Sequence, residues 1–403
     1  MNRTTKIKVL IIVENLPVPF DTRVWKEAIT LTKNGYEVFV ICPMGKGFEK
    51  KFEILEGVRI YRHILPKEGN GAVGYLLEYF SAFCWEFFLS LKVFFKHRFH
   101  IIQGCNPPDN IFIIALFFKI FGVKYIFDHH DVNPELYYAK FHRKDALYKI
   151  QVWLEKMTFR FCDVAMSTNQ TYKDIAISRG GMDPDHVFVV RNGPDLNIFK
   201  PVRPIIGLKH NKRYLVGYVG TMSIQEGLDI LLEVALYIKQ LRRTDIHFTC
   251  IGGGPGLEEL IDLKNKMGLQ DMVNFTGRIP DRELLEILST ADVCVNPDRP
   301  NEMNNISTMI KIMEYMALRK PIVQFDLKEG RFSAQDASLY AENGSIISFA
   351  EKIIWLLDNP EERIKMGDIG LKRVNDHLSW SHSVPNLLLA YSDVVKVLKH
   401  QAF

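Results

Sequence analysis

Residues 100–131 of the chain read HIIQGCNPPDNIFIIALFFKIFGVKYIFDHHD, and this stretch decides the fold class. The runs at 100–105 and 124–131 are short and apolar, as buried strands are, and the apolar run from Ile111 has the length of a helix. A strand, a helix and a second strand in this order predict a parallel pair joined by a helical crossover. The stretch therefore predicts an α/β domain with a parallel sheet.

The same alternation continues on both sides of this unit. In the first half, further strands are expected at 7–14, 36–43, 161–168 and 187–193, with helices at 22–34 and 171–181. After a segment rich in proline and basic residues, the alternation restarts with strands at 214–220, 246–254, 272–277, 292–297 and 321–326. We therefore expect two doubly wound, Rossmann-like domains with helices between their strands.

The expected domain boundaries follow from this pattern and from the chain length of 403 residues, which suits two domains of average size. The first domain is predicted over 1–199, a linker over 200–212, and the second domain over 213–384. An amphipathic helix over 385–403 either stays with the second domain or crosses back to the first. Because ligands of open α/β sheets bind at the carboxyl ends of the strands, a cleft between the two domains is the predicted site.

Composition and charge restrict the class of protein. With 47% hydrophobic and 24% charged residues, the chain is predicted to be globular and folded. The net charge is +4, and the residues up to Asp195 carry 26 Lys and Arg against 21 Asp and Glu. This excess favours a phosphate-bearing or membrane partner and is too weak to predict nucleic-acid binding. The six scattered cysteines form no C-x-x-C pair, so they are interpreted as free thiols in a reducing, cytoplasmic compartment.

One long apolar segment raises the question of a membrane. Val73–Phe95 is long enough to cross a bilayer but contains Glu78, Glu86 and Lys92, so we interpret it as an amphipathic helix. Its aromatic residues and the basic residues near its end suit an interfacial helix, which predicts that Tyr75–Phe99 docks peripherally on the inner face of the cell membrane. The alternative is that the same helix packs against the sheet, and both can hold if its faces differ.

Two polar loops have residues that are also found in cofactor sites. Asp128-His129-His130-Asp131 follows a predicted buried strand, but four consecutive residues cannot all point at one ion, so no metal site is predicted. We expect one histidine to be structural and the other to orient a substrate. The glycine run at 252–256 lacks the third glycine of a G-x-G-x-x-G fingerprint, so no dinucleotide cofactor is expected either.

Several segments in a fixed order resemble glycosyltransferase family 4, a large retaining family with the GT-B fold that includes builders of bacterial surface polysaccharides. The resemblance covers nearly the whole chain. It is carried by DTRVWKEAITLTKNGYEVFVICP (21–43), FDHHDVNPE (127–135), VFVVRNGPDLNIFKP (187–201), GYVGTMSIQEGLDILLE (217–233), IGGGPGLEEL (251–260), VNFTGRIPDRELLEILSTADVCVNP (273–297) and STMIKIMEYMALRKPIV (307–323).

The resemblance implies roles for particular residues. Glu314 matches the second of two family glutamates and would accept hydrogen bonds from the donor ribose, whereas the first falls at Ile306 and is absent. His130 matches a histidine that contacts the transferred sugar, with Asp131 beside it as a further catalytic residue. Asp21 and Arg23 are assigned to the acceptor side.

The donor-binding set implied by the resemblance is Gly220, Thr221, Gln225, Arg278, Ile279, Ser307, Thr308, Met309, Lys311 and Glu314. Thr221 and Glu226 stand where the family often has an arginine and a lysine that clamp the phosphates. Candidate replacements are Lys311, Arg278 and Arg23, together with the backbone N–H groups of Ser307–Met309, where a helix is expected to begin.

These observations predict a retaining, metal-independent glycosyltransferase that needs no cofactor, because no D-x-D motif is suitably placed. Its expected partners are a nucleotide-sugar donor, with UDP favoured only as a family tendency, a glycan or lipid-linked acceptor, and an anionic membrane surface. Two alternatives stay open: a non-catalytic nucleotide-binding relative, and a GT-B nucleotide-sugar epimerase.

Overall fold

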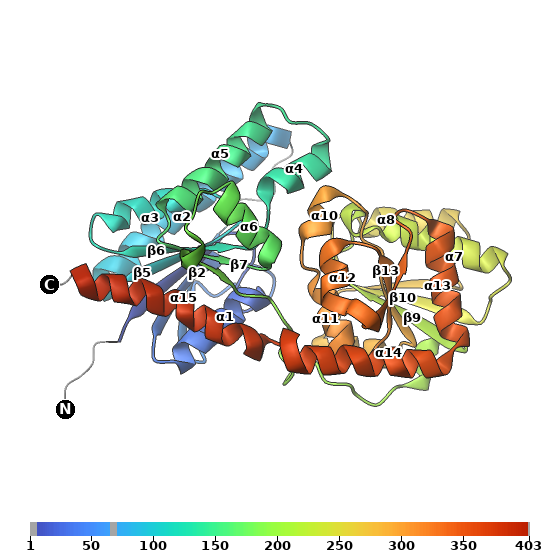
Figure 1. The fold of residues 1–403 in the computed structure, drawn as a ribbon. Coiled ribbons are helices and arrows are strands. Elements are labelled where there is room, and N and C mark those ends of the chain that lie inside the picture. Colours follow the sequence, from blue (N-terminus) through green and yellow to red (C-terminus); the bar gives the residue numbers. More distant parts are fainter. Residues whose placement is uncertain (1–5, 65–70, 402–403) are drawn as a thin grey trace. The chain divides into compact units, whose positions relative to one another are not determined.

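The computed structural model describes residues 6–64 and 71–401, which form two compact units. The first comprises Met1–Arg191 and Val384–Phe403, and the second comprises Asn192–Ser383. Each unit has its own largely parallel sheet with helices on both faces (Figure 1). The predicted pair of doubly wound α/β domains is therefore confirmed.

The first sheet has eight strands in the order β3-β4-β2-β1-β5-β6-β7-β8. Their bounds are β1 Lys8–Val13, β2 Glu37–Pro43, β3 Phe52–Leu55, β4 Val58–His63, β5 Ile101–Cys105, β6 Lys124–His129, β7 Val164–Ser167 and β8 Val187–Val189. All neighbours pair in parallel except β3, which is antiparallel to β4 at the edge. This edge hairpin was not predicted, because Phe52–Leu55 is only half-buried and lacks an apolar run.

The helices of the first unit divide between the two faces of this sheet. They are α1 Thr22–Lys33, α2 Gly71–His97, α3 Ile111–Lys119, α4 Asn133–Phe141, α5 Ala146–Phe161, α6 Gln170–Ser178 and α15 Trp380–Gln401, whose first residues belong to the second unit. Ile102 joins the apolar cluster formed with α2, α3 and α5. Because side chains alternate across a strand, Gln103 faces the opposite side, where α1 and α15 lie (Figure 1).

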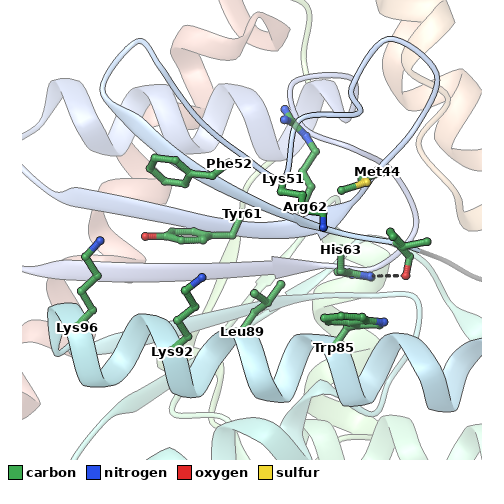
Figure 2. Close-up of a pocket in the computed structure, with 11 residues that line it drawn as sticks. Met44, Lys51, Phe52, Tyr61, Arg62, His63, Trp85, Leu89, Lys92 and Lys96 are labelled. Carbon is green, nitrogen blue, oxygen red and sulfur yellow. Dashed lines mark hydrogen bonds between the residues drawn. The ribbon is translucent and has the colours of Figure 1, made fainter.

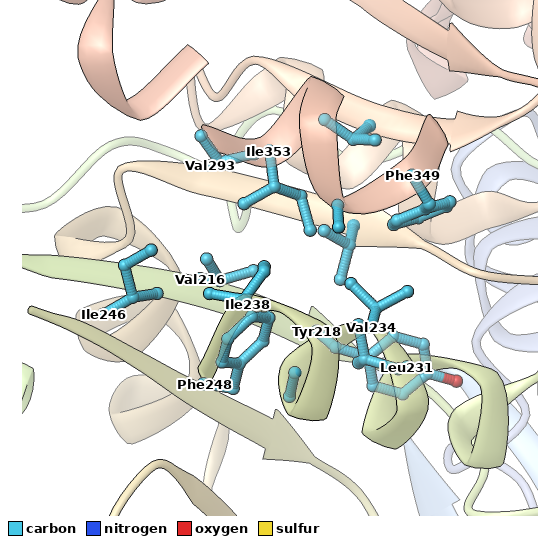
Figure 3. Close-up of a cluster of buried hydrophobic side chains, with 14 of the residues drawn as sticks. Val216, Tyr218, Leu231, Val234, Ile238, Ile246, Phe248, Val293, Phe349 and Ile353 are labelled. Carbon is cyan, nitrogen blue, oxygen red and sulfur yellow. The ribbon is translucent and has the colours of Figure 1, made fainter. Parts of the chain in front are cut away.

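The second sheet has six parallel strands in the order β11-β10-β9-β12-β13-β14. Their bounds are β9 Tyr214–Val219, β10 Ile246–Ile251, β11 Val273–Gly277, β12 Val293–Asn296, β13 Ile322–Phe325 and β14 Ser338–Ala341. The helices are α7 Leu228–Gln240, α8 Leu257–Lys266, α9 Asp281–Thr290, α10 Glu302–Ile306, α11 Ile310–Ala317, α12 Lys328–Ala334, α13 Ile346–Asp358 and α14 Pro360–Arg373. Figure 3 shows the core, where side chains of β9 and β10 such as Val216 and Phe248 pack beneath α7 and α13.

The division of the chain differs from the predicted boundaries at both ends of the second unit. Residues 192–199, expected in the first domain, cluster with the second unit, where Leu196 and Phe199 pack against its core. The segment 200–212, expected to be a linker, also belongs to the second unit. It is held by two hydrogen bonds, from Val202 N to Ser289 Oγ at 3.1 Å and from Ile205 N to Thr290 Oγ1 at 2.9 Å. Residues 384–403 cluster with the first unit. The cleft between the units stays a prediction.

One face of helix α2 packs against the sheet, and docking of this helix on a membrane stays a prediction. Ala82, Glu86 and Ser90, spaced four residues apart, are fully buried against the sheet, whereas Phe80 and Phe88 are 66% and 64% exposed. The side chains of Tyr75–Glu78, which belong to the predicted docking segment, lie outside the described residues. Among the described residues, none of the helices combines the length and the apolar character that a membrane crossing requires.

The loops after β9 and β10 approach each other so closely that only glycine fits between them. Gly252 has φ +140°, and a Cβ atom at this position would lie 1.9 Å from the carbonyl oxygen of Gly220. We therefore expect Gly252→Ala to lower the free energy of unfolding by at least about 2 kcal/mol, since strain and overlap act together. Urea denaturation measures this change.

Gly207→Ala is the matched control, because Gly207 lies in the same unit and its added Cβ would meet nothing within 4 Å. It should change the free energy of unfolding by less than about 1 kcal/mol. Equal effects of the two substitutions would show that the close approach of the two loops does not constrain the unit.

Candidate functional site

A buried ion pair lies at the carboxyl end of β6 in the first unit. Asp128 is fully buried, and its two carboxylate oxygens contact Arg23 Nη2 and His130 Nε2, each at 2.6 Å. Arg23 reaches this point from the first turn of α1, where the Asp21 carboxylate accepts hydrogen bonds from Arg23 N at 3.1 Å and Val24 N at 3.0 Å. Asp21 therefore caps the helix that carries Arg23.

The guanidinium of Arg23 is engaged in hydrogen bonds within the protein. Besides Asp128 it donates to the carbonyl oxygen of Val190 at 2.7 Å, and the side chain is only 4% exposed. Burial opposes ionisation of Asp128, but the charges of Arg23 and His130 hold the pKa of its carboxyl well below the usual range. Arg23 thus holds the site together, and the structure gives no support to its use as a phosphate clamp.

His130 is oriented from two sides. Asn106 Oδ1 accepts from His130 N at 2.6 Å and from Asp131 N at 3.1 Å, which fixes the turn that follows β6. Burial works against protonation of the ring, but the Asp128 carboxylate raises the pKa of His130 above its ordinary value. Because the His130 side chain keeps 15% exposure, it can present a protonated imidazole to a ligand.

Two further residues behind Asp128 were not singled out from the sequence. Gln103 Nε2 donates to Glu27 Oε2 at 2.6 Å and to Asp128 Oδ2 at 3.1 Å. Tyr391 of α15 donates its hydroxyl proton to Gln103 Oε1. The signal for Gln103 was a polar residue inside an apolar strand, whereas nothing local in the sequence marks Tyr391, which lies 288 positions from its partner.

Glu27 differs from Asp128 in its protonation. Burial and the charge of Asp128 raise the pKa of Glu27 to about 8, although Arg23 Nε lies 3.2 Å from Glu27 Oε1. Arg23 cannot neutralise two carboxylates at once, and its shorter contact is to Asp128. Glu27 is therefore a buried neutral acid at neutral pH, and the cluster holds one net positive charge when His130 is protonated.

The other histidine of this loop, His129, has a structural role, as expected for one of the two histidines. His129 is fully buried and packs against Phe127, Phe159 and Tyr172, and burial lowers its pKa to about 3. It is therefore neutral at physiological pH.

Among the described residues, one group of three could each offer an atom to a metal ion: Cys105, Asp128 and His130, whose ligand atoms lie within 4.8 Å of one another. These three side chains are poorly suited to bind a metal ion. The Nε2 of His130 is already bonded to Asp128, and burial raises the pKa of the Cys105 thiol well above its usual range.

A second buried ion pair lies in the second unit, around Lys311 of α11. Its ammonium group donates to Glu226, which comes from the loop after β9, and to Asp298 Oδ1 at 3.1 Å, which follows β12. Tyr218 Oη donates to the same Glu226 carboxylate at 2.9 Å. Burial disfavours the charge on Lys311, but Asp298 and Glu226 raise its pKa above the ordinary value.

This cluster changes the interpretation of the missing phosphate clamp. The position at which the family often has a lysine holds Glu226, and that glutamate is the counter-ion of Lys311. Burial raises the pKa of Asp298 to about 6, so near neutral pH the second carboxyl can take up a proton. The buried cation of this cluster thus comes from α11 instead of the loop after β9, and the cluster is neutral only when Asp298 is protonated.

The other predicted donor residues lie at the same carboxyl edge of the second sheet. Gly220, Thr221 and Gln225 follow β9, and Arg278 and Ile279 follow β11, with Arg278 exposed. Ser307–Met309 lie between α10 and α11, and Met309 is the residue before the first turn of α11. Glu314 is half-buried and lies three residues after Lys311 on α11. The contact between Glu226 and Lys311 joins the loop after β9 to this helix.

Two family descriptions match the chain, one in each half. Residues 22–198 match "Glycosyltransferase Family 4", and residues 213–359 match "Glycosyl transferases group 1". Among curated proteins, the chain is similar to α-maltose-1-phosphate synthase of Mycolicibacterium smegmatis, with 23% identity over 68% of this chain and 74% of that protein.

Solved structures show the same architecture. Sucrose-phosphate synthase from Thermosynechococcus elongatus superposes with a TM-score of 0.78 at 16% identity, covering 97% of this chain and 100% of that one. The Anabaena protein HepE in complex with UDP and glucose superposes with a TM-score of 0.72 at 14% identity, covering 96% and 99%. Together these matches identify the chain as a glycosyltransferase with the GT-B fold and support its resemblance to family 4.

The protonation of Glu27 predicts a pH dependence of stability. A group whose pKa is raised on folding stabilises the protein fully below its unfolded pKa of about 4.5 and loses this contribution as pH rises toward about 8. Between pH 5 and 8 the wild type should therefore lose stability relative to Glu27→Gln, by up to about 1.4 kcal/mol per pH unit. Urea denaturation at several pH values measures the difference. The exposed Glu351→Gln serves as control, and parallel pH profiles for wild type and Glu27→Gln would contradict the assignment.

Proposed function

We propose that this glycosyltransferase moves a hexosyl or N-acetylhexosaminyl group from a UDP-sugar to a glycan or lipid-linked acceptor, with retention of anomeric configuration and without a metal ion, in the synthesis of a surface polysaccharide. The observation that carries the proposal is the cluster on α11. A buried cation, a helix that begins at Ile310 and a carboxylate at Glu314 lie within two turns of one helix. These are the groups that a diphosphate and a ribose require.

The donor phosphates would bind at the start of α11. Backbone N–H groups at the beginning of a helix favour a negative charge, and Lys311 follows one residue into the helix. A diphosphate that approaches Lys311 competes with Glu226 and Asp298 for the ammonium protons. Since Asp298 has a pKa of about 6, protonation of this group would lower the cost of that exchange.

The nucleoside and the sugar would be bound by neighbouring groups. A carboxylate accepts two hydroxyl protons at once, so Glu314 suits the two hydroxyls of the ribose. The backbone at Arg278 and Ile279 would read the base, and the loop with Gly220, Thr221 and Gln225 would cover the phosphates. His130, with Asp131 beside it, would contact the transferred sugar as a protonated hydrogen-bond donor.

This arrangement explains how the reaction could proceed without a metal. The bond that breaks leaves negative charge on the diphosphate, and a buried cation with helix N–H groups stabilises such charge more strongly than the same groups do in water. Lys311 is held in its charged form by two carboxylates, and no proton has to move to prepare it.

The first unit is proposed to bind the acceptor and to dock on the inner face of the cell membrane. Helix α2 exposes Phe80, Phe88 and Phe95, and the turn that follows α3 exposes Ile120 and Phe121. The rings of Phe94 and Phe121 lie 5.4 Å apart, so the turn after α3 packs against α2. Apolar burial and attraction of nearby basic side chains to anionic headgroups add in such a surface.

One observation favours a second candidate function, which is binding of a nucleotide without catalytic activity. Lys311 is engaged by two carboxylates, so the cationic clamp is weaker than a free lysine would be. The ordered, partly exposed His130 argues for the catalytic alternative, since binding a nucleotide alone does not require a sugar contact.

The assignment of Glu314 is tested by nucleotide binding. UDP should raise the melting temperature of the wild type, because a ligand that binds only the native state stabilises it. Glu314→Ala should fold and bind UDP about 10- to 100-fold more weakly in calorimetry, as expected for the loss of hydrogen bonds to a charged group. The exposed Glu302→Ala on α10 is the charge-matched control. Wild-type affinity in Glu314→Ala would refute its role, and a wild type that binds none of UDP, GDP, ADP or their sugars would refute the function.

Metal independence is tested by turnover in a chelator. Release of UDP from a UDP-sugar in the presence of acceptor-containing membranes should proceed at an unchanged rate in EDTA, because Lys311 and α11 carry the leaving-group charge. Complete loss of turnover in EDTA that Mn²⁺ or Mg²⁺ restores would contradict this mechanism.

A further inference from the structure

A cavity of about 420 Å3 lies in the first unit, between helix α2 and the edge hairpin β3–β4 (Figure 2). Its volume is within the range of small-molecule sites in proteins. Phe52 and Tyr61 line it from the strands, Trp85 and Leu89 from the helix, and His63 lies at the end of β4. The site described above does not use any of these residues.

Helix α2 contributes one continuous stripe to the cavity. Trp85, Leu89, Lys92 and Lys96 follow each other at spacings of four, three and four residues, which places them on one face of the helix. Figure 2 shows all four side chains in a row along α2, on the side that faces the strands. The stripe runs from an aromatic and apolar end to a cationic end, so the cavity is itself amphipathic.

The charges around the cavity are of one sign. Lys51, Lys92 and Lys96 line it, and among the described residues none of their ammonium groups has a carboxylate within 4.0 Å. Arg62 differs, because its guanidinium contacts Glu53 at 2.6 Å and is already neutralised. No Asp or Glu lines the cavity in the described part of the chain. Three uncompensated cations around one cavity favour an anionic ligand.

The inner end of the cavity carries a polar atom without a partner. His63 is 2% exposed, and its Nε2 has no hydrogen-bond partner among the described residues, although its Nδ1 lies 3.4 Å from the carbonyl oxygen of Ile64. Buried polar groups are normally hydrogen-bonded, and one that is not often lies beside a ligand or water site. Figure 2 shows His63 directly beside Trp85.

The cationic stripe adjoins an apolar surface on the same helix. Phe80, Phe88 and Phe95 follow one another along α2 at intervals of about two turns, and each is more than 60% exposed. Lys92 and Lys96 stand on α2 next to this face. An occupant with an anionic head and an apolar chain would therefore match both features at once, whereas a free anion would match only the lysines.

We propose that this cavity binds the phosphate head of a lipid phosphate, with the ammonium groups of Lys92 and Lys96 at the phosphate and the alkyl chain along Trp85 and Leu89 toward the exposed phenylalanines. The inference deepens the proposed function, since it names the chemical class of a ligand for the membrane-facing unit. It places that ligand at a site separate from His130.

Decyl phosphate is a soluble probe that carries both required groups. Calorimetry on the full chain should show that it binds, and that Lys92→Gln/Lys96→Gln weakens binding about tenfold or more, as expected when charge-assisted hydrogen bonds are lost. Lys149→Gln/Lys156→Gln is the matched control, because both lysines are exposed on α5 of the same unit. Decanol and inorganic phosphate at the same concentration should each bind at least tenfold more weakly than decyl phosphate.

Three outcomes would overturn the proposal. Wild-type affinity of the double variant for decyl phosphate would show that the cavity is not the site. Equal affinity for inorganic phosphate would show a simple anion site. Binding to vesicles with anionic lipid but not to monomeric decyl phosphate would show a charged surface without a headgroup site. UDP binding, measured in parallel, should be the same in both double variants and the wild type, so a failure of the glycosyltransferase proposal is seen separately.

Discussion

The structure depends on the rule that a buried charge must be paired. Each unit places one such pair at the carboxyl edge of its sheet: Asp128 with Arg23 and His130 in the first, and Lys311 with Glu226 and Asp298 in the second. Removing one partner of a buried pair leaves an uncompensated charge, which costs about 3–5 kcal/mol. The charged side chains that the proposed chemistry uses are therefore also the ones that fix the loops around them.

The two pairs differ in what they make available. In the first unit, Arg23 is fully occupied and its charge serves to keep Asp128 ionised, which in turn raises the pKa of the partly exposed His130. In the second unit the two carboxylates hold Lys311 in its charged form, and the ammonium group is the one that the proposed function uses. Glu226 stands in the loop after β9 where the resemblance to family 4 would place a lysine, and it pairs with Lys311 of α11.

The fold was predictable from the sequence because nearly all strands of both sheets are continuous apolar runs separated by helices. The run at 100–131 formed β5, α3 and β6 as expected. The edge hairpin was missed because its exposed strand carries no such run, and the boundary at residue 199 was wrong because Leu196 and Phe199 pack into the second core. His130 and Lys311 were candidates from the sequence because one follows a strand and the other lies in the first turn of a helix. Tyr391 could not be singled out, because its partner Gln103 is adjacent only in the folded chain.

The central proposal is that His130, held protonated by Asp128, contacts the transferred sugar of the donor. Histidine-ring NMR of the full chain, with His130 assigned among its 12 histidines by a His130→Gln variant, tests this claim most directly. The account predicts an apparent pKa of His130 above about 6.5, a shift of its ring signals on addition of the UDP-sugar that binds, and no comparable shift with UDP alone. A His130 that titrates at or below the usual value, and whose signals the UDP-sugar leaves unchanged while it binds, would contradict the account.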